Sequence, residues 1–490
     1  MKTVVVLGAA YGGARAAQLI AASLPEGWRI VLVDRNSHVN HVYILPRLAV
    51  LPGHEHKAFI PCDNIFNVET LDPTRHIFLR ATVLSFSSHS VKLSRAFPEL
   101  GFPSNTLEFD FAVYALGSHL PSPLNLWSAS PDGKPCPRPY DGDKSEGIAW
   151  LKRKQAVIQA ASSVLCVGGG ALGIQFASDI AALHPEKRVT LLHSRHRLLP
   201  RFDAAMHTEI LQELESLGVD VVLGERLDLS TMPSKEGEVL ATSHVVRTTT
   251  GREISADLVM LCTGQVPNTE LLSAFDESTV DADTRLAHVL RTMQLGVLPT
   301  PTSPVPESPA SPASFVESSE VMQSEAQDEA ALLEAALAQI ALQDEEQRTL
   351  SPTPSMTASE SSLEEVDELG SLPDAEPEPT PYPHIFVVGD SADAFGAIPA
   401  GHNAYYQAEV AAKNVLKLIA SKDAELERYT PGLPAIKVSL GLRKNVYQVN
   451  GVVGVGRETR DDLNAAAIWG YFGCPLTLGE GEEDREEMHR

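Results

Sequence analysis

The chain has 490 residues, 43% of them hydrophobic, which is enough for about three folded domains. Its formal net charge is −25, and residues 297–381, with 18 acidic residues and one basic residue, carry −17 of this charge. The remaining −8 includes no basic stripe that could neutralise phosphates, so the composition argues against nucleic-acid binding.

The cysteines and the N-terminal residues indicate in which compartment the protein lies and which reactions are disfavoured. The five cysteines lie far apart and form no C-x-x-C pair, which is typical of a reducing compartment and disfavours a disulfide reductase. The first strand begins by residue 3 or 4, which leaves no room for a signal peptide, and Lys2 stands where myristoylation requires glycine. No apolar run approaches the roughly 18 residues of a membrane span. We therefore expect a cytoplasmic protein without a transmembrane segment, and peripheral contact with a membrane stays open.

The N-terminal stretch, residues 4–34, predicts a strand, a glycine turn, a helix and a second strand. The apolar run at residues 4–7 is typical of a parallel strand buried on both faces. The turn from Gly8 to Gly13 follows directly, and the second strand ends at Asp34. In units that bind dinucleotides, such glycines let the pyrophosphate reach the first turn of the helix, and the carboxylate binds the ribose.

Ala10 takes the place of the usual middle glycine of this motif, so its methyl group must fit beside the phosphates. The alternative interpretation is a glycine-rich turn that binds nothing. The helix that follows the turn and the position of Asp34 make dinucleotide binding the better interpretation.

A polar, histidine-rich stretch follows Asp34. His38, His41, His54 and His56 do not have the spacing of a common zinc site, so we expect no metal there. Arg47 and Lys57 could neutralise a pyrophosphate, although cations on the surface are the common alternative. Residues 77–86, 90–93 and 106–114 then alternate like antiparallel strands and lead into a small-residue turn at Gly117, before a connector at residues 120–143.

A second nucleotide signature begins at residue 164. Gly168, Gly170 and Gly173 form a complete G-x-G-x-x-G between an apolar strand and a helix over residues 171–183. His193 stands at the end of the next strand, where an acidic residue is usual, and Arg195 follows. Without a carboxylate, the 2′-phosphate of NADPH meets no repulsion, and Arg195 could pair with it. The alternative is an exposed arginine that does not touch the cofactor.

Two such units in one chain imply two dinucleotides, and electron transfer between them is the simplest use of this arrangement. A helix over residues 202–217, a strand at 219–223 and a last apolar strand at 256–262 complete the second unit. Residues 286–295 could return the chain to the first sheet. Near the C-terminus, an apolar strand ends at Asp390, whose carboxylate could bind a ribitol hydroxyl, cap a helix, or do both.

Residues 297–381 are rich in Pro, Ser, Thr and acidic residues, so we predict a disordered insertion. Within it, residues 325–342 have helical spacing, and both a helix that binds a protein partner and a transient helix stay open. Residues 429–475 alternate like a small β-rich domain, and we expect the acidic tail beyond Gly479 to be disordered.

The predicted fold is α/β, with two Rossmann-like dinucleotide-binding domains, the second inserted in the first, and a small C-terminal β-rich domain. The predicted boundaries are 1–127 for the first part of the first dinucleotide-binding domain, 150–275 for the second dinucleotide-binding domain, 276–296 and 382–422 for the second part of the first domain, 297–381 for the insertion and 425–478 for the C-terminal domain.

Several motifs together resemble a known family. The first set resembles the two-dinucleotide flavoproteins related to pyridine nucleotide-disulfide oxidoreductases, and consists of GAAYGG with VDR, then YALGS, GGGALG, LCTGQVPN and IFVVGDSAD. The second set is similar to the apoptosis-inducing-factor-like branch that includes the ferroptosis suppressor, and consists of RNSHVNHVYILPRLAV, HEHKAFIPC, EKRVTLLHSRHRLLPRF, LGVDVVLGERL and TPGLPAIKVSLG. The resemblance covers nearly all of the chain outside the insertion.

The resemblance implies FAD in the first unit and NAD(P)H in the second. It places FAD-binding roles on Gly8, Ala10, Gly12, Gly13, Asp34, Arg47, Lys57, Val83, Gly117 and Asp390. It places NAD(P)-binding roles on Gly168, Gly170, Gly173 and Gly264, to which Gln175, His193 and Arg195 are added as candidates.

The chain departs from the family pattern at three places. Gln175 stands where the family usually has Glu, the loop FGAIPAGHN lacks the lysine that relatives place near the flavin, and the myristoylation signal is missing. We expect an FAD-dependent NAD(P)H oxidoreductase that passes electrons to a small-molecule acceptor, such as a quinone, without a side chain acting as nucleophile. The alternative is a redox-sensing or death-signalling protein that binds the cofactors with little turnover.

Overall fold

The computed structural model describes residues 1–66, 71–127, 140–232, 244–298, 380–476 and 484–490. The predicted insertion lies almost entirely outside these residues, as does the helix expected at residues 325–342. Each helix of the described residues is too short or too polar to cross a membrane.

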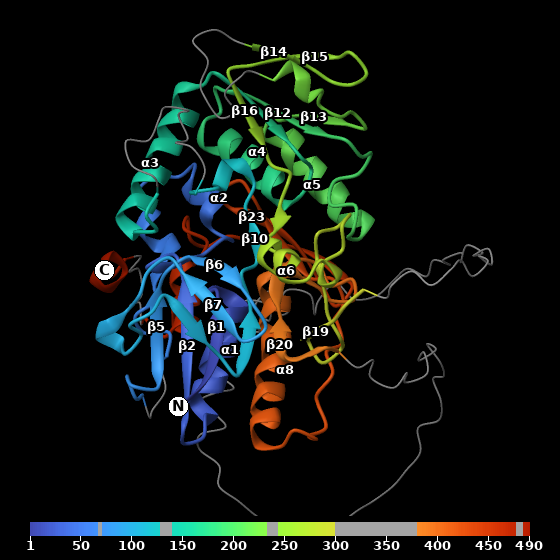
Figure 1. Ribbon diagram of the computed structural model, residues 1–490. Coiled ribbons are helices and arrows are strands. Elements are labelled where there is room, and N and C mark those ends of the chain that lie inside the picture. Colours follow the sequence, from blue (N-terminus) through green and yellow to red (C-terminus); the bar gives the residue numbers. More distant parts are fainter. Residues whose placement is uncertain (67–70, 128–139, 233–243, 299–379, 477–483) are drawn as a thin grey trace, which may run out of the picture.

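A six-stranded sheet organises the first unit, in the order β19-β20-β9-β1-β2-β5 (Figure 1). Its strands are β1 (Lys2–Leu7), β2 (Trp28–Asp34), β5 (His76–Arg80), β9 (Phe111–Tyr114), β19 (Gln294–Leu295) and β20 (Tyr382–Val387). All neighbours pair in parallel except β19 and β20. Because β19 and β20 follow the second unit in the sequence, the second unit is inserted in the first, which confirms the predicted fold class.

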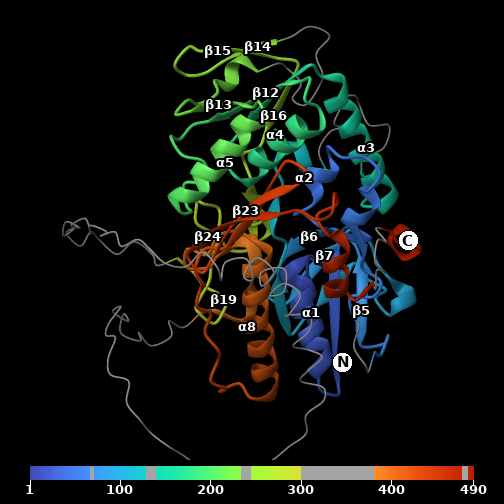
Figure 2. The ribbon, with the colours of Figure 1, turned by 180° about the vertical axis from the view of Figure 1, so that it is seen from behind.

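Two different layers cover this sheet (Figures 1 and 2). Helices α1 (Tyr11–Ser23) and α8 (Gly401–Ala420) pack together on one face. A Cβ on Gly12 would lie 2.9 Å from the carbonyl oxygen of Ala404, so this glycine allows the two helices to approach closely. On the other face lies the antiparallel sheet of β6 (Val83–Phe86), β7 (Ser90–Leu93) and β8 (Thr106–Glu108), where the Phe86 ring meets Tyr114 edge-on.

The expectation of antiparallel strands over residues 77–86 and 106–114 is only half right. Each run divides into two strands, and β5 and β9 join the parallel sheet beside β2 and β1. Asp110, at the break between β8 and β9, accepts a hydrogen bond from the backbone N–H of Thr3 at 2.8 Å. This contact across the fold starts β9 beside β1, and the alternation of residues along one segment does not reveal such a partner.

The second unit has a parallel four-stranded sheet in the order β13-β12-β11-β16. Its elements are α3 (Lys144–Ala160), β11 (Ser163–Val167), α4 (Ala171–Leu183), β12 (Arg188–His193), α5 (Ala204–Ser216), β13 (Asp220–Leu223), β14 (His244–Arg247), β15 (Glu253–Ala256) and β16 (Leu258–Leu261). The strands β10 (Ser118–His119) and β17 (Val266–Pro267) pair antiparallel where the chain passes between the two units.

The C-terminal segment contains the expected β-rich part, an antiparallel sheet of β22 (Ile436–Leu440), β23 (Lys444–Val449) and β24 (Val452–Arg457). The aromatic residues that follow form a 3-10 helix, η7 (Ala465–Phe472). β22 packs on α4 of the second unit, whereas η7 contacts β4 (Phe59–Pro61) of the first unit. The C-terminal segment therefore joins the two units.

The expectation of a disordered tail is wrong for its last residues. Residues 484–490 are described, and the 3-10 helix η8 (Glu486–His489) lies against η1 (Glu55–Ala58). The Met488 side chain is fully buried, and the Lys144 ammonium donates a hydrogen bond to the Met488 carbonyl oxygen at 2.7 Å. The shorter elements are α2 (Leu45–Leu48), α6 (Glu270–Phe275), β3 (His38–Asn40), β18 (Ala287–His288) and β21 (Ala392–Asp393), with further 3-10 turns at Pro98–Leu100, Ser122–Leu124, Leu229–Thr231, Glu277–Thr279 and Gly389–Ser391.

Candidate functional site

The first glycine turn joins β1 to α1. Gly8 has a φ of +96°, and a Cβ on it would lie 2.3 Å from the carbonyl oxygen of Ala115. A Cβ on Gly13 would lie 1.8 Å from the carbonyl oxygen of Gly8. No side chain caps α1, so the N–H groups of its first turn are open to an anion. The turn thus fits a pyrophosphate.

The second glycine turn repeats this geometry between β11 and α4. Gly168 has a φ of +125°, and a Cβ on Gly173 would lie 1.9 Å from the carbonyl oxygen of Gly168. Gly170 caps α4 with φ −87° and ψ 178°, and Ala10 caps α1 with φ −81° and ψ 175°. Both cap residues are exposed. At this cap position the first cradle therefore carries one methyl group more than the second, and the backbone has the same conformation in both.

Asp34 and His193 occupy matching places at the ends of β2 and β12. Asp34 Oδ2 accepts a hydrogen bond from the N–H of Ala9 at 2.8 Å, and His193 Nδ1 accepts one from the N–H of Gly169 at 3.0 Å. Both acceptors hold the residue that follows the first glycine of their turn. Burial raises the pKa of Asp34 and lowers the pKa of His193. His193 therefore takes over the contact of the usual carboxylate while adding no negative charge.

Arg195 lies two residues beyond β12 and is exposed. Its carbonyl oxygen accepts a hydrogen bond from the N–H of Gly224 at 3.0 Å, which fixes the backbone at the end of the strand. Burial is the main cause that lowers the pKa of His193, and the positive charge of Arg195 lowers this pKa further, so the cation lies near the end of β12. Its contact with a 2′-phosphate stays a prediction.

Three strand ends that lie far apart in the sequence meet at Asp390. Its Oδ2 accepts hydrogen bonds from Ser118 Oγ at 2.9 Å and from Gln265 Nε2 at 2.7 Å. Ser118 follows Gly117, and Gln265 follows Gly264, so the ends of β9, β16 and β20 converge there. Burial raises the pKa of Asp390. The arrangement is a polar junction between the two units.

Two positions of this junction require glycine because of their positive φ angles, and not because neighbouring atoms would clash with a Cβ. Gly117 has a φ of +64° and Gly264 a φ of +89°, and no atom lies within 4 Å of the Cβ that each would carry. The space beside both residues is therefore open, as a bound cofactor would need.

The N-terminus of α8 lies beside that of α1. A Cβ on Gly401 would lie 3.0 Å from the Tyr11 ring, and no side chain caps α8. Two helix N-termini thus place partial positive charge in one region. A cavity of about 160 Å³ lies next to it and is lined by Asp390, Pro399 and Asn403, among others.

Gln175 lies on α4, beyond the second glycine turn. Its side chain is 6% exposed, and its Nε2 has no hydrogen-bond partner among the residues that the structure describes. A buried amide donor without a partner is costly, so a group that accepts its hydrogen bond would stabilise the site. This observation fits a bound cofactor.

Arg47 and Lys57 form buried ion pairs. Arg47 Nε donates to Asp179 Oδ2 at 2.9 Å, and both side chains are 0% exposed. Lys57 Nζ lies 2.6 Å from Asp462 Oδ2. These contacts join the stretch before β4 to α4 and to the C-terminal segment, and the contact of Arg47 and Lys57 with FAD stays a prediction. Val83 opens β6, two residues after Ala81, whose N–H donates to the Asp34 carbonyl oxygen at 2.8 Å.

Three further residues of the candidate site, Ser118, Gln265 and Tyr11, are not among those predicted from the sequence. The Tyr11 hydroxyl lies 2.9 Å from His41 Nδ1 and accepts a hydrogen bond from the N–H of Val42 at 3.2 Å, which ties the first glycine turn to the loop before α2. A signal was present for Ser118 and Gln265, because each directly follows a glycine already assigned to the site.

Comparisons with known proteins agree with this geometry. Residues 2–291 match the family model for pyridine nucleotide-disulphide oxidoreductases. The chain belongs to this family. Fe-regulated protein 8 of Mycosarcoma maydis is 37% identical over 473 residues, which cover 96% of this chain and 94% of that protein. Ferroptosis suppressor protein 1 of Homo sapiens is 27% identical over 267 residues, which cover 53% of this chain and 62% of that protein.

Among solved structures, the fold is similar to that of the sulfide:quinone oxidoreductase of Aquifex aeolicus, with a TM-score of 0.57 and 13% identity, covering 96% of this chain and 90% of that one. The resemblance to the pyridine nucleotide-disulphide oxidoreductases is thus confirmed, and the cofactors are FAD and NAD(P)H. The glycine cradles, the uncapped helices and the buried Gln175 amide fit these cofactors.

Proposed function

We propose that this pyridine nucleotide-disulphide oxidoreductase reduces a small-molecule acceptor, such as a quinone, with electrons from NAD(P)H. The chemistry that the two cofactors supply when bound is hydride transfer from the nicotinamide to the flavin. The observation that carries the proposal is the junction at Asp390, where residues from both glycine-turn units contact one another. A shared junction is what two cofactors need to lie close together.

The residues of the chain would bind and orient the cofactors. The first-turn N–H groups of α1 would hold the FAD pyrophosphate, and Asp34 would hold its ribose. Ser118 and Gln265 both donate to Oδ2 of Asp390, and this carboxylate would accept a hydrogen bond from a ribitol hydroxyl. Gln175 Nε2 would donate to a cofactor oxygen in the second unit.

The cysteines support an acceptor that takes electrons from the flavin directly. Burial raises the pKa of Cys166 to about 12, and burial also raises the pKa values of Cys62 and Cys474. A thiol is a nucleophile only as a thiolate, so these three cysteines are poorly suited to relay electrons to a disulfide. Together with the absence of a C-x-x-C pair from the sequence, this favours a quinone-like acceptor over a disulfide.

NADPH is the nicotinamide cofactor that we favour. His193 replaces the carboxylate that would repel a 2′-phosphate, and Arg195 lies exposed two residues beyond it. We also propose that the protein is cytoplasmic and that residues 297–381 bind a protein partner.

The test uses the purified full-length chain. The protein should be yellow, its flavin absorption should bleach with NADPH in the absence of oxygen, and a water-soluble quinone should restore the absorption over many turnovers. Colourless protein from flavin-replete cells would refute the proposal. Bleaching without reoxidation by quinones, dyes or oxygen would instead support a redox-sensing protein that binds both cofactors.

Glycine variants separate the two cradles. Gly13→Ala should release FAD, and Gly173→Ala should keep FAD but slow bleaching by NADPH, because each new Cβ would lie within 2 Å of a carbonyl oxygen. Gly432→Ala is the matched control, since no atom lies within 4 Å of its Cβ and its φ is not positive. It should bind FAD and react like the natural chain.

A further inference from the structure

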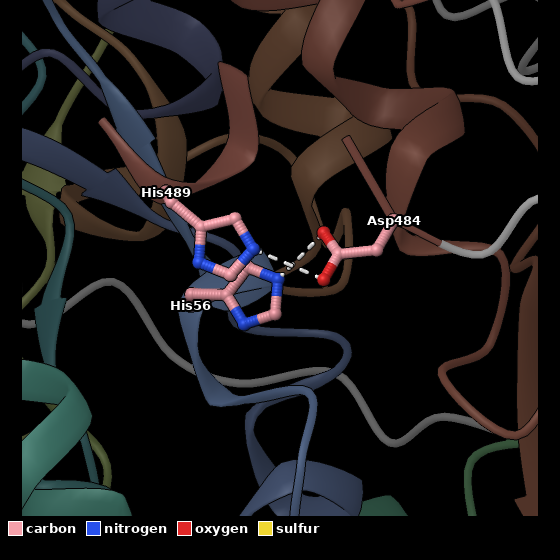
Figure 3. A group of neighbouring side chains, drawn as sticks. All are labelled: His56, Asp484 and His489. Carbon is pink, nitrogen blue, oxygen red and sulfur yellow. Dashed lines mark hydrogen bonds and ion pairs between the residues drawn. The ribbon is translucent and has the colours of Figure 1, made fainter. Parts of the chain in front are cut away.

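Two histidines and an aspartate from opposite ends of the chain meet on the surface of the first unit. His56 belongs to η1, and Asp484 and His489 belong to the C-terminal segment (Figure 3). His56 Nε2 lies 2.9 Å from Asp484 Oδ1, and His489 Nε2 lies 3.0 Å from Asp484 Oδ2. One ligand atom from each residue can be chosen so that all three lie within 4.8 Å of one another.

The position of His56 is fixed by its neighbours on η1. On one side, Glu55 Oε1 accepts a hydrogen bond from Gln155 Nε2 at 2.9 Å. On the other side, Lys57 is paired with Asp462, and its carbonyl oxygen accepts a hydrogen bond from Trp469 Nε1 at 3.2 Å. The His56 side chain is 8% exposed, so it is held in place, as a metal ligand requires.

The other two residues are anchored less tightly and stay accessible. The segment next to His489 is held by the buried side chain of Met488 and by the hydrogen bond that Lys144 donates to the Met488 carbonyl oxygen. The side chains of Asp484 and His489 are 44% and 56% exposed, so an ion can reach them from solvent. The two imidazole rings are stacked, and the Asp484 carboxylate lies opposite their Nε2 atoms (Figure 3).

We propose that His56, Asp484 and His489 bind a divalent transition metal ion of the zinc class, which fastens the C-terminal segment to η1. Two imidazole nitrogens and one carboxylate oxygen are a ligand set that Zn²⁺ accepts in tetrahedral geometry, with a fourth position for water. Mg²⁺ and Ca²⁺ prefer oxygen ligands alone and bind this set poorly.

The ligand atoms are close to the spacing that an ion requires, whereas one imidazole ring must change its orientation to bind it. Ligand atoms about 2.1 Å from a tetrahedral ion lie roughly 3.4 Å apart, slightly farther than the hydrogen-bond distances in the cluster. The two imidazole rings are stacked, with centroids 4.0 Å apart and planes at 14°. Their lone pairs must converge on one point, so the exposed His489 ring is the part that tilts when the ion binds.

The experiment is calorimetric titration of the full-length chain, without a histidine affinity tag and after removal of metals with a chelator. Zn²⁺ should bind with a stoichiometry of one, and Mg²⁺ and Ca²⁺ should give no comparable heat. His489→Gln should raise the dissociation constant for Zn²⁺ at least about tenfold, because one of three ligands is lost. The matched control is His244→Gln on β14, which should bind Zn²⁺ like the natural chain.

A second measurement follows the segment itself. Zn²⁺ should slow hydrogen exchange of the amides at residues 485–489 at least about tenfold in the natural chain and leave it unchanged in His489→Gln. Absence of zinc binding, equal affinity of His489→Gln, or equal binding of Mg²⁺ would each overturn the proposal. The flavin absorption of the variant reports separately that it has folded, so the outcome does not depend on the activity.

Discussion

The preference for NADPH can be tested at His193 by returning the missing carboxylate. In His193→Asp, the new side chain should accept the hydrogen bond from the Gly169 N–H, as Asp34 does from the Ala9 N–H at 2.8 Å in the first cradle. The turn should therefore keep its conformation. What changes is the charge beside the ribose of the bound nicotinamide cofactor.

The size of the effect follows from Coulomb's law. Two unit charges about 5 Å apart, at an effective dielectric constant of about 20, repel each other by about 3 kcal/mol. His193 is only partly buried, so solvent reduces this repulsion, and we take half of it. About 1.5 kcal/mol corresponds to roughly a tenfold loss in kcat/KM for NADPH relative to NADH.

The assay compares kcat/KM for NADPH and NADH with a quinone or a dye as acceptor. The matched control is His193→Asn, which also presents an acceptor to the Gly169 N–H but carries no charge. We expect the ratio of the two values to fall about tenfold in His193→Asp and to stay within about threefold in His193→Asn. Equal ratios in both variants would refute the reasoning, since they would mean that the charge at this position does not face the ribose.

Three further predictions concern stability and the insertion. Burial lowers the pKa values of His38 and His41 to about 3, so the folded chain binds fewer protons than the unfolded chain between pH 6.5 and 3, and stability falls as pH falls through this window. From pH 7 to 5, each histidine should lower the free energy of unfolding by about 2 kcal/mol. Urea unfolding of His41→Gln should therefore show only the loss of stability that His38 causes. Asp179→Ala should cost about 3–5 kcal/mol by leaving Arg47 unpaired, and unfolding of the double variant with Arg47→Met should show recovery of part of the loss. Because Leu295 pairs with Tyr382, replacing residues 299–379 by a short Gly/Ser linker should leave the flavin spectrum unchanged, and loss of flavin would contradict this.

The local parts of the fold could be predicted from the sequence. The helix expected at residues 171–183 has these bounds, because the glycine turn before it and the His-Pro sequence after it mark both ends. The directions of β5 and β9 could not be predicted, because parallel pairing with β2 and β1 depends on segments far away in the sequence. A period of two residues indicates a strand but not its partner.

The roles of single charged residues were hidden for the same reason. The partners of Arg47 and Lys57, Asp179 and Asp462, lie 132 and 405 residues away in the sequence. The four histidines after Asp34 do not act together either. His41 contacts Tyr11, whereas His56 contacts residues at the C-terminus. Spacing within one stretch could not reveal a site whose other members lie at the far end of the chain.

These long-range contacts join the two units that carry the glycine cradles. Arg47 donates to Asp179 on α4 of the second unit, to the Asp461 carbonyl oxygen at 2.9 Å and to the Gly441 carbonyl oxygen at 2.5 Å. One buried guanidinium of the first unit thus binds both the second unit and the C-terminal segment. Because hydride transfer depends on the distance and angle between two rings, this guanidinium should influence the reaction by holding the two units against each other. A change at Arg47 should therefore slow flavin reduction by NADPH more than it weakens the binding of NADPH, whereas a change within a glycine turn should first weaken binding.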